Sequence, residues 1–577
     1  MLSYRKLAMC VLGRPPPQYG GGGIDLPRPA SQRAAAFILT AAMLTTLAAP
    51  AFAKEWYIED GDITVKAGET EGTNKVSQGA NQEVEDTDTI IKNREDTASS
   101  NTVTIDAGSD KVEVTLKDVN IDTSSRNKAA VSVTGSGNTT IKLDGDNHLT
   151  GGNGIYSNSS GSLTISGDEN DSLTAQGGDS RNGIYSVSGD VTISGGTVTA
   201  TGGNSTGSYG SGGDGIHSGS LTISGGTVTA TGGGSTGSNG LGGRGICSDS
   251  GSVTISGGTV NANGGDGKNG SDGGDGICSD SGDVTISGGT VTATGGGSTG
   301  SNGLGGDGIR SDGGVTISGG TVKAAGGDSK DGYGGDGIRS GGGVTISGNT
   351  VNAAGGNGGK VGGYGICSFD RVTISSNTVN AADGSSGSSN GGSGIYSSGI
   401  DLSGSLELTA KAGSPNGKAL SQKGSELDLN AIKDKLGPGA KVTATDADGK
   451  VIAQVPIPRP VEPEESSSSS DGGSAAPSAP ASSLPGLTVT DKDGQRISYT
   501  STQSGNTLTV CVGRLTASFR ISLAALRQLR AEGIETITFQ TILCSTTLSV
   551  DELLAMGGED AEAVLTHRFT DSSLTVG

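Results

Sequence analysis

The sequence has very few large aromatic side chains, with 6 phenylalanines and 1 tryptophan among 577 residues. A compact domain of this length would need many more large apolar side chains to fill its interior. Their scarcity excludes one large globular core. It favours an elongated fold whose core is a thin column of aliphatic side chains.

Positive charge is also scarce, because 39 lysines and arginines face 60 acidic residues and leave a net charge of −21. Nucleic acids and anionic membrane surfaces attract basic patches, so this balance argues against both as partners. It permits cations such as Ca²⁺. Beyond residues 1–53 there is no long hydrophobic run, and we expect no transmembrane segment.

Cysteine and histidine are rare, with 6 and 3 residues, and no C-x-x-C pair occurs. The sequence therefore predicts no zinc site. Cys247 and Cys278 hold the same position in successive repeats, which would bring their Cα atoms within reach of a disulfide. We expect that bridge, and a second between Cys511 and Cys544, with Cys367 left free.

Glycine is abundant, with 107 residues, and much of it belongs to a repeat such as "GIYSVSGDVTISGGTVTATGG". One isoleucine of the V-T-I-S element marks each copy, and consecutive markers are 28 to 32 residues apart: Ile165, Ile193, Ile223, Ile255, Ile286, Ile317, Ile346 and Ile374. A period of this length is typical of solenoids, propellers and arrays.

Each repeat contains three short segments in which apolar and polar residues alternate, as strands do. In residues 184–201 the inward candidates are Ile184, Val191, Ile193, Val198 and Ala200. Stacked repeats would bury these rows as one column, so we predict a parallel β-helix with three sheets and one coil of about 30 residues per repeat. A propeller blade needs four strands in a longer repeat, which disfavours that alternative. Length varies in the Gly/Ser/Asn loop before each G-I-x-S element, which puts the loops along one edge.

The chain divides into five parts. Residues 1–53 resemble a signal peptide that ends at Ala53, which predicts a secreted or cell-surface protein. We expect an N-terminal cap and irregular first coils in 54–142, and the repeat β-helix with its C-terminal cap in 143–455. A Pro/Ser-rich linker (456–485) then leads to a small α+β domain (486–577).

The segments "VTLKDVNID", "NTTIKLDGDNHLTGGNGIYS" and the serial "VTISGGTVTATGG" resemble bacterial secreted carbohydrate-binding-domain-containing proteins of clostridia and related gut Firmicutes. The likeness covers roughly residues 100–400. It implies a right-handed parallel β-helix that binds polysaccharide, with acidic plant cell-wall glycans as the usual ligands. It transfers no defined set of binding residues.

The residue after the isoleucine of each G-I-x-S element should point outward, because the isoleucine points inward. Tyrosine can stack on sugar rings, and arginine can grip a carboxylate with two N–H groups. We therefore predict a solvent-facing carbohydrate-binding row for uronic acid polymers: Tyr156, Tyr185, His217, Arg310, Arg339 and Tyr396. The alternative is an exposed strand position that varies freely.

Two rows of aspartates flank this position, one in the preceding turn (Asp275, Asp307, Asp336) and one two residues after it (Asp280, Asp312). Stacked carboxylates about 5 Å apart repel one another by about 0.8 kcal/mol in water. A shared Ca²⁺ would remove the repulsion and would bridge an acidic protein to an acidic glycan. The alternative is that aspartate is simply a favoured turn residue.

We expect no enzymatic activity, because the coils are nearly uniform and none is marked by unique residues. The only local cluster of types suited to a polysaccharide lyase or glycosidase is Asp307, Arg310, Asp336 and Arg339. The main alternative function is an adhesin or structural stalk. Its solenoid would display the C-terminal domain to a cell-surface or host partner.

Overall fold

The computed structural model describes residues 54–456 and 486–576. Within these ranges it omits 238, 269–270, 349, 376–377 and 389, and then 492–494, 498, 505, 513–516, 542–544, 557–560 and 568–571. The expected signal peptide and nearly all of the expected linker lie outside the described residues. Chain contacts divide the protein into two units, residues 1–462 and 463–577, which are treated separately here.

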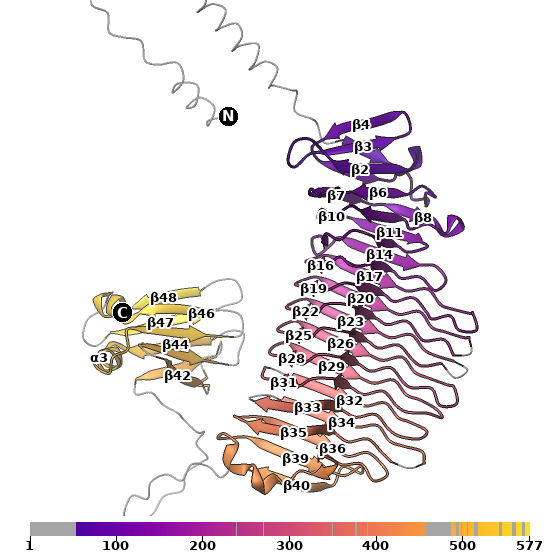
Figure 1. The fold of residues 1–577 in the computed structure, drawn as a ribbon. Coiled ribbons are helices and arrows are strands. Elements are labelled where there is room, and N and C mark those ends of the chain that lie inside the picture. Colours follow the sequence, from indigo (N-terminus) through magenta and orange to yellow (C-terminus); the bar gives the residue numbers. More distant parts are fainter. Residues whose placement is uncertain are drawn as a thin grey trace, which may run out of the picture. The chain divides into compact units, whose positions relative to one another are not determined.

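The first unit is a β-solenoid of about 14 turns with about 29 residues per turn, as the repeat predicts (Figure 1). Each regular coil has three strands, and each strand pairs in parallel with its counterpart in the next coil. The first ladder contains β6 (Val103–Asp106), β9 (Val131–Thr134), β12 (Ile155–Ser157), β15 (Ile184–Ser186), β18 (Ile216–Ser218), β21 (Ile246–Ser248), β24 (Ile277–Ser279), β27 (Ile309–Ser311) and β30 (Ile338–Ser340).

The second ladder contains β5 (Thr89–Lys92), β7 (Val112–Lys117), β10 (Thr139–Asp144), β13 (Leu163–Ser166), β16 (Val191–Ile193), β19 (Leu221–Ile223), β22 (Val253–Ile255), β25 (Val284–Ile286), β28 (Val315–Ile317) and β31 (Val344–Ile346). Two long strands, β33 (Ile366–Ser375) and β35 (Ile395–Ser403), run through the corner between the two ladders. The first two expected sheets are therefore joined into one 27-stranded sheet.

The third ladder is a separate 13-stranded sheet. It contains β8 (Asn120–Asp122), β11 (Asp146–Gly151), β14 (Ser172–Gly177), β17 (Thr197–Thr201), β20 (Thr227–Thr231), β23 (Thr259–Asn263), β26 (Thr290–Thr294), β29 (Thr321–Ala325), β32 (Thr350–Ala354), β34 (Thr378–Ala382), β36 (Glu407–Lys411), β39 (Lys441–Thr445) and β40 (Val451–Pro456). Pro456, expected to begin the linker, thus ends the last strand of this sheet.

The core is the column of aliphatic side chains that the period-two pattern predicts. Ile193 pairs in register with Ile223, and both are fully buried. All five inward candidates of residues 184–201 have no exposed surface. Burial of one Val or Ile side chain contributes about 1.5–3 kcal/mol, so the column is the main source of stability.

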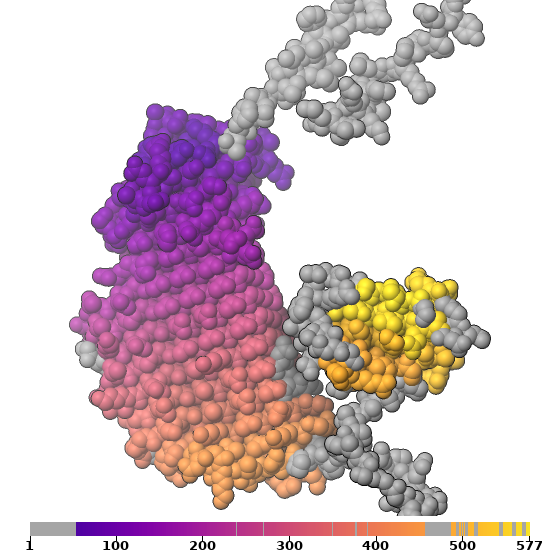
Figure 2. Space-filling model, turned by 180° about the vertical axis from the view of Figure 1, so that it is seen from behind, coloured from indigo at the N-terminus to yellow at the C-terminus, as the bar shows by residue number. Residues whose placement is uncertain are grey.

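The glycine-rich loops form a second stacked structure along one edge (Figure 1). Each loop has an outgoing and a returning segment, which we call its two legs. Within one loop the Gly306 N–H donates to the Gly296 carbonyl at 2.9 Å, and between neighbouring loops the Gly327 N–H donates to the Gly306 carbonyl at 2.8 Å. The legs pack so closely that a Cβ at Gly327 would lie 2.0 Å from the Gly296 oxygen. Glycine is therefore required by close approach of backbones. Figure 2 shows the successive coils as closely packed rows.

Antiparallel strands lie at both ends of the solenoid, where parallel stacking stops. At the N-terminal end, β2 (Ile63–Ala67), β3 (Asn74–Gln78) and β4 (Asn81–Asp86) form a meander, and β1 (Lys54–Tyr57) carries the buried Trp56. At the C-terminal end, β37 (Leu420–Gln422) pairs with β38 (Ser425–Glu426), and β39 pairs with β40. These elements cover ladder ends that would otherwise expose unpaired backbone groups.

The second unit is sheet-rich, with two four-stranded sheets. One contains β41 (Leu487–Thr490), β44 (Ala517–Ser522), β47 (Glu562–His567) and β48 (Ser572–Val576), and the other β42 (Thr500–Ser504), β43 (Thr507–Cys511), β45 (Thr536–Gln540) and β46 (Ser545–Ser549). Two helices, α3 (Leu523–Ala531) and α4 (Val550–Met556), accompany the described strands, in keeping with the expected α+β domain. Ser522 caps α3, with its hydroxyl accepting from the Ala525 N–H.

Candidate functional site

The position after the isoleucine forms one continuous row on the first ladder, as the sequence predicts. We call this row the stripe. Each member pairs in register with the next, and the members are Tyr156, Tyr185, His217, Cys247, Cys278, Arg310, Arg339, Cys367 and Tyr396.

The expectation that the stripe faces solvent is wrong at its three cysteines, and five of its other members are only half-buried. Cys247 and Cys278 are fully buried and Cys367 is 3 % exposed, while Arg339 alone among the nine is classed as exposed. Four members of the stripe, Arg310, Arg339, Cys367 and Tyr396, line a groove beside the stacked loops.

The turn residues three positions before the stripe, which include Asp275, Asp307 and Asp336, serve mainly to join successive coils by hydrogen bonds. In each case one side-chain oxygen accepts the backbone N–H of the equivalent residue one coil further on. Asp307 N–H donates to Asp275 Oδ1 at 2.8 Å, and Asp336 N–H donates to Asp307 Oδ1 at 2.6 Å. Asn153 and Asn182 make the same bond at the start of the row. This role accounts for the recurrence of Asp and Asn at this position.

Arg310 neutralises three of the five aspartates expected to bind calcium. Its Nε donates to Asp275 Oδ2 at 2.8 Å, its Nη1 to Asp312 Oδ1 at 3.0 Å, and its Nη2 contacts Asp280. Asp280 also accepts from Arg244 Nη1 at 2.9 Å. At these three aspartates the protein thus already supplies positive charge of the kind for which Ca²⁺ was invoked.

The other two expected calcium ligands, Asp307 and Asp336, are 7 % and 5 % exposed. Burial raises the pKa of Asp336 to about 6, and burial together with the Asp336 charge raises the pKa of Asp307 well above its usual value. The nearest guanidinium, that of Arg339, lies 4.0 Å from Asp307 Oδ2 and 3.9 Å from Asp336 Oδ2. The structure therefore brings Asp307, Asp336 and Arg339 together, as the sequence suggested. The two aspartates form a buried acid pair, and the arginine lies at a distance from both.

His217 bridges the two carboxylate rows. Its Nδ1 lies 2.7 Å from Asp214 Oδ2, and its Nε2 lies 2.8 Å from Asp249 Oδ2. Burial disfavours the imidazolium, but the hydrogen bond and charge of Asp214, with further help from Asp249, outweigh burial and raise the pKa of His217 to about 9. The imidazole is thus a second cation of the network.

The expected disulfides are not formed in the described residues. Cys247 and Cys278 are adjacent as predicted, but both thiols are free. Arg244 Nη1 lies 2.9 Å from Cys247 Sγ, and Arg310 Nη2 lies 2.9 Å from Cys278 Sγ, so each sulfur faces a guanidinium. Cys511 is also free, and its expected partner Cys544 lies outside the described residues.

A groove with a volume of about 890 Å³ runs beside the C-terminal half of the stripe. Arg310, Arg339 and Tyr396 line it, together with Asp275, Asp307, Asp312 and Asp336. Its lining reaches from the coil of Leu241 to that of Tyr396, which spans about 24 Å at about 4.8 Å per coil. The expected carbohydrate row is therefore divided, because Tyr156 and Tyr185 line a separate pocket of about 520 Å³.

Sequence reasoning missed the outer wall of this groove. One loop residue per coil forms it, paired in register through Leu304, Tyr333, Val361 and Asn390. Tyr333 is 44 % exposed and Leu304 45 %. Each wall residue comes directly before the G-G of its repeat, so an alignment of the repeats would have shown the row.

The C-terminal part of the groove is rich in aromatic rings. Tyr364 and Tyr396 stack with centroids 4.9 Å apart and planes inclined at 18°. Phe369 is 60 % exposed, and the Arg339 guanidinium lies 5.5 Å from the centroid of its ring. An apolar, cationic surface of this kind can hold a ring-shaped polar ligand that carries negative charge.

Arg310→Gln should destabilise the solenoid by about 2 kcal/mol, because it leaves the largely buried Asp275 without its cation and removes one of the two cations that contact Asp280. We reduce the value for a buried ion pair because the Arg310 side chain is 22 % exposed. Denaturant unfolding followed by circular dichroism measures the loss. Arg371→Gln is the control: it breaks an ion pair with Asp401 whose side chains are 56 % and 43 % exposed, and it should cost under about 1 kcal/mol. If the two variants lost equal stability, the Arg310 ion-pair network would contribute no more than one exposed ion pair, which would contradict our interpretation.

Among known proteins, a family model described as a beta helix repeat matches residues 221–243, 253–275, 284–309 and 315–338. These segments cover four coils that the structure also shows, so the match supports a parallel β-helix. Searches of curated proteins and of solved structures returned no match. In the part of the chain that the structure describes, no helix is both long and apolar enough to cross a membrane.

Proposed function

We propose that the chain is an exported protein whose solenoid binds a polysaccharide, with a preference for uronic acid polymers, in the groove between the stripe and the loop wall. The single observation that carries the proposal is the exposed group of Phe369, Tyr333 and Arg339 beside the stacked tyrosines. Exposed aromatic rings in a groove are costly in water unless a ligand covers them.

The dimensions and charge of the groove support a chain-like acidic ligand. A length of about 24 Å accommodates several sugar rings in a row rather than one. The Arg339 side chain is 45 % exposed and its contacts with Asp307 and Asp336 are long, so its N–H groups can bind a ligand carboxylate. The guanidinium also explains how a protein of net charge −21 could hold an acidic glycan.

Calcium assistance stays a prediction. The pairing of Asp275, Asp280 and Asp312 with Arg310 weakens its original rationale. The binding experiment therefore includes one arm with Ca²⁺ and one with chelator. Retention that survives the chelator would assign the acidic glycan to Arg339 rather than to a bridging cation.

The test is titration calorimetry of the full chain with oligogalacturonates and with neutral oligosaccharides of equal length. Phe369→Ala should weaken binding about fivefold, because loss of one stacking ring costs about 1 kcal/mol. Arg339→Gln should remove the preference for the acidic ligand while leaving neutral binding unchanged.

Tyr209→Ala is the matched control, since Tyr209 is 79 % exposed and does not line the groove. Its affinity should equal that of the wild type. Absence of binding to any glycan would overturn the proposal and favour the structural stalk that displays the second unit.

The same samples test for catalysis, because beta-helix repeats occur in enzymes and in non-enzymes alike. A lyase acting on a uronic acid polymer releases an unsaturated product that absorbs ultraviolet light. We expect no increase in absorbance, because the coils that line the groove are nearly uniform and none is marked by unique residues. An increase would show that the Asp307–Asp336 pair and its neighbouring arginines are catalytic.

A further inference from the structure

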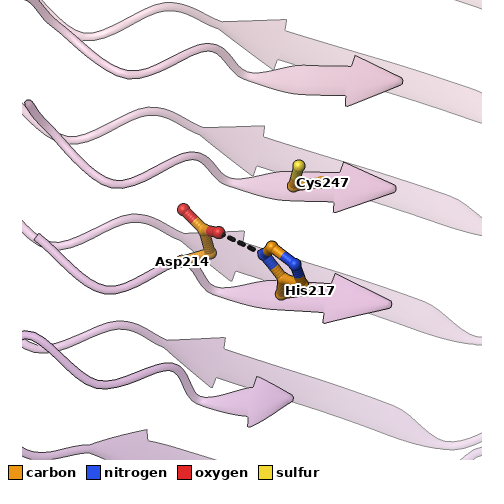
Figure 3. Close-up of side chains that lie close together, drawn as sticks. All are labelled: Asp214, His217 and Cys247. Atoms are coloured by element: carbon orange, nitrogen blue, oxygen red, sulfur yellow. Dashed lines mark hydrogen bonds and ion pairs between the residues drawn. The ribbon is translucent and has the colours of Figure 1, made fainter. Parts of the chain in front are cut away.

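Three side chains from two neighbouring coils, those of Asp214, His217 and Cys247, lie close together (Figure 3). Asp214 ends the turn before β18, His217 lies on β18, and Cys247 lies opposite His217 on β21. One oxygen, one nitrogen and the sulfur of these residues all lie within 4.8 Å of one another. Cys247 is fully buried and its thiol is free.

We propose that Asp214, His217 and Cys247 form a binding site for one divalent transition-metal ion of the zinc type. Thiolate, imidazole and carboxylate are the donors that Zn²⁺ selects, with bond lengths of about 2.0–2.3 Å. Donors of one tetrahedral ion lie roughly 3–4 Å apart. The present separations therefore need only small side-chain movements, and the fourth position is left for water or a ligand atom.

The surroundings of His217 support the proposal independently of the donor set. Its Nε2 lies 2.8 Å from Asp249 Oδ2, so Nε2–H can donate to that carboxylate while Nδ1 faces Asp214. Metal-binding histidines are commonly held by a carboxylate on the ring nitrogen that does not bind the ion. The other oxygen of Asp214 accepts the Arg244 N–H at 2.7 Å, which fixes the carboxylate.

A neighbouring cluster of Cys247, Cys278 and Asp280 is equally compact but already holds cations. Arg244 contacts Cys247 and Asp280, and Arg310 contacts Cys278 and Asp280. A metal ion there would have to displace two guanidinium groups. On the His217 side of Cys247 the cation is the imidazolium, whose Nδ1 proton a metal ion can replace, and only the Arg244 contact with Cys247 Sγ at 2.9 Å would have to be given up.

The sequence argument against zinc relied on contiguous motifs, and this site has none. His217 and Cys247 are 30 residues apart, but that distance is one coil, and parallel register places them side by side. The stacking of coils thus brings two metal ligands close together in space, as the short spacing of a C-x-x-C motif does in a compact zinc domain.

Cobalt titration of the full-length, reduced protein under anaerobic conditions tests the proposal. We expect one Co²⁺ per chain with a thiolate-to-cobalt charge-transfer band, and loss of the band when Zn²⁺ displaces the cobalt. Cys247→Ser should abolish the band, and His217→Gln should weaken binding at least tenfold. Asp249→Asn should retain the band but bind about 10–100-fold more weakly, as expected of a residue that positions the imidazole.

Cys367→Ser is the matched control, because Cys367 is a buried, free thiol of the same stripe with no histidine beside it. Its titration should match that of the wild type. Circular dichroism verifies that each variant is folded, and His217→Gln decides the matter if Cys247→Ser does not fold. A wild-type titration without a thiolate band, or a band that survives in both Cys247→Ser and His217→Gln, would overturn the site.

Discussion

Gly327→Ala should destabilise the solenoid by about 3 kcal/mol or more, although it adds a single methyl group to a surface loop. The new Cβ would lie 2.0 Å from the Gly296 oxygen and 2.5 Å from the Gly296 carbonyl carbon. No side-chain rotation can relieve a clash between backbones, so the two loops must separate. Their separation would break the Gly327–Gly306 and Ser298–Asp328 backbone hydrogen bonds, which join the two loops, as well.

Thermal unfolding should record the loss of stability, and hydrogen exchange should locate it in the loops on either side. The control is Gly297→Ala in the preceding loop, where the nearest atom to a new Cβ, the Asp328 oxygen, is 3.3 Å away. We expect a change of under about 1 kcal/mol there. Similar effects at both positions would mean that the loops do not stack this closely.

The sequence predicts the solenoid well because its core obeys a rule of period two. Once Ile193 and Ile223 are recognised as equivalent, the in-register column follows, and so does the order of the stripe. Alternation tells which side chains point inward. It does not tell whether an outward side chain meets water or another part of the coil.

The candidate site is less predictable for that reason. Cys247 was expected to face solvent and is fully buried, because it lies between His217 and Cys278 with the Arg244 guanidinium on its sulfur. The sequence placed the glycine-rich loops along one edge, but only the structure shows how closely they stack on one another. The ion pairs of Arg310 could not be read from the sequence either, because its partners Asp275 and Asp280 are 35 and 30 residues away in the chain.

Asp336→Asn should stabilise the protein at pH 8 and remove part of its pH dependence. Burial raises the pKa of Asp336 to about 6, whereas the unfolded chain titrates near 4. Between these values the folded state binds more protons than the unfolded state, so stability is full below about pH 4 and falls as the pH rises through about 6. The difference corresponds to about 3 kcal/mol at pH 8, which the neutral amide should largely restore.

Asparagine preserves the structural role of the position, because its carbonyl can accept the Tyr364 N–H that Asp336 Oδ1 now accepts at 2.7 Å. Asn153 and Asn182 already fill this position in earlier coils with the same bond. The substitution therefore removes the buried charge and little else. Chemical denaturation at pH 4.5 and at pH 8 should show a gain only at the higher pH.

Asp328→Asn is the control that separates burial from hydrogen bonding. Asp328 Oδ1 accepts the Asn357 N–H at 2.7 Å in the same coil-to-coil geometry, but Asp328 is exposed. Its substitution should change stability by under about 1 kcal/mol at either pH. If Asp336→Asn instead destabilises the protein at pH 8, the carboxylate must be ionised and held by Arg339. In that case the groove would present a formed ion pair to its ligand rather than an available arginine, and the proposed role of Arg339 in binding an acidic glycan would fail with it.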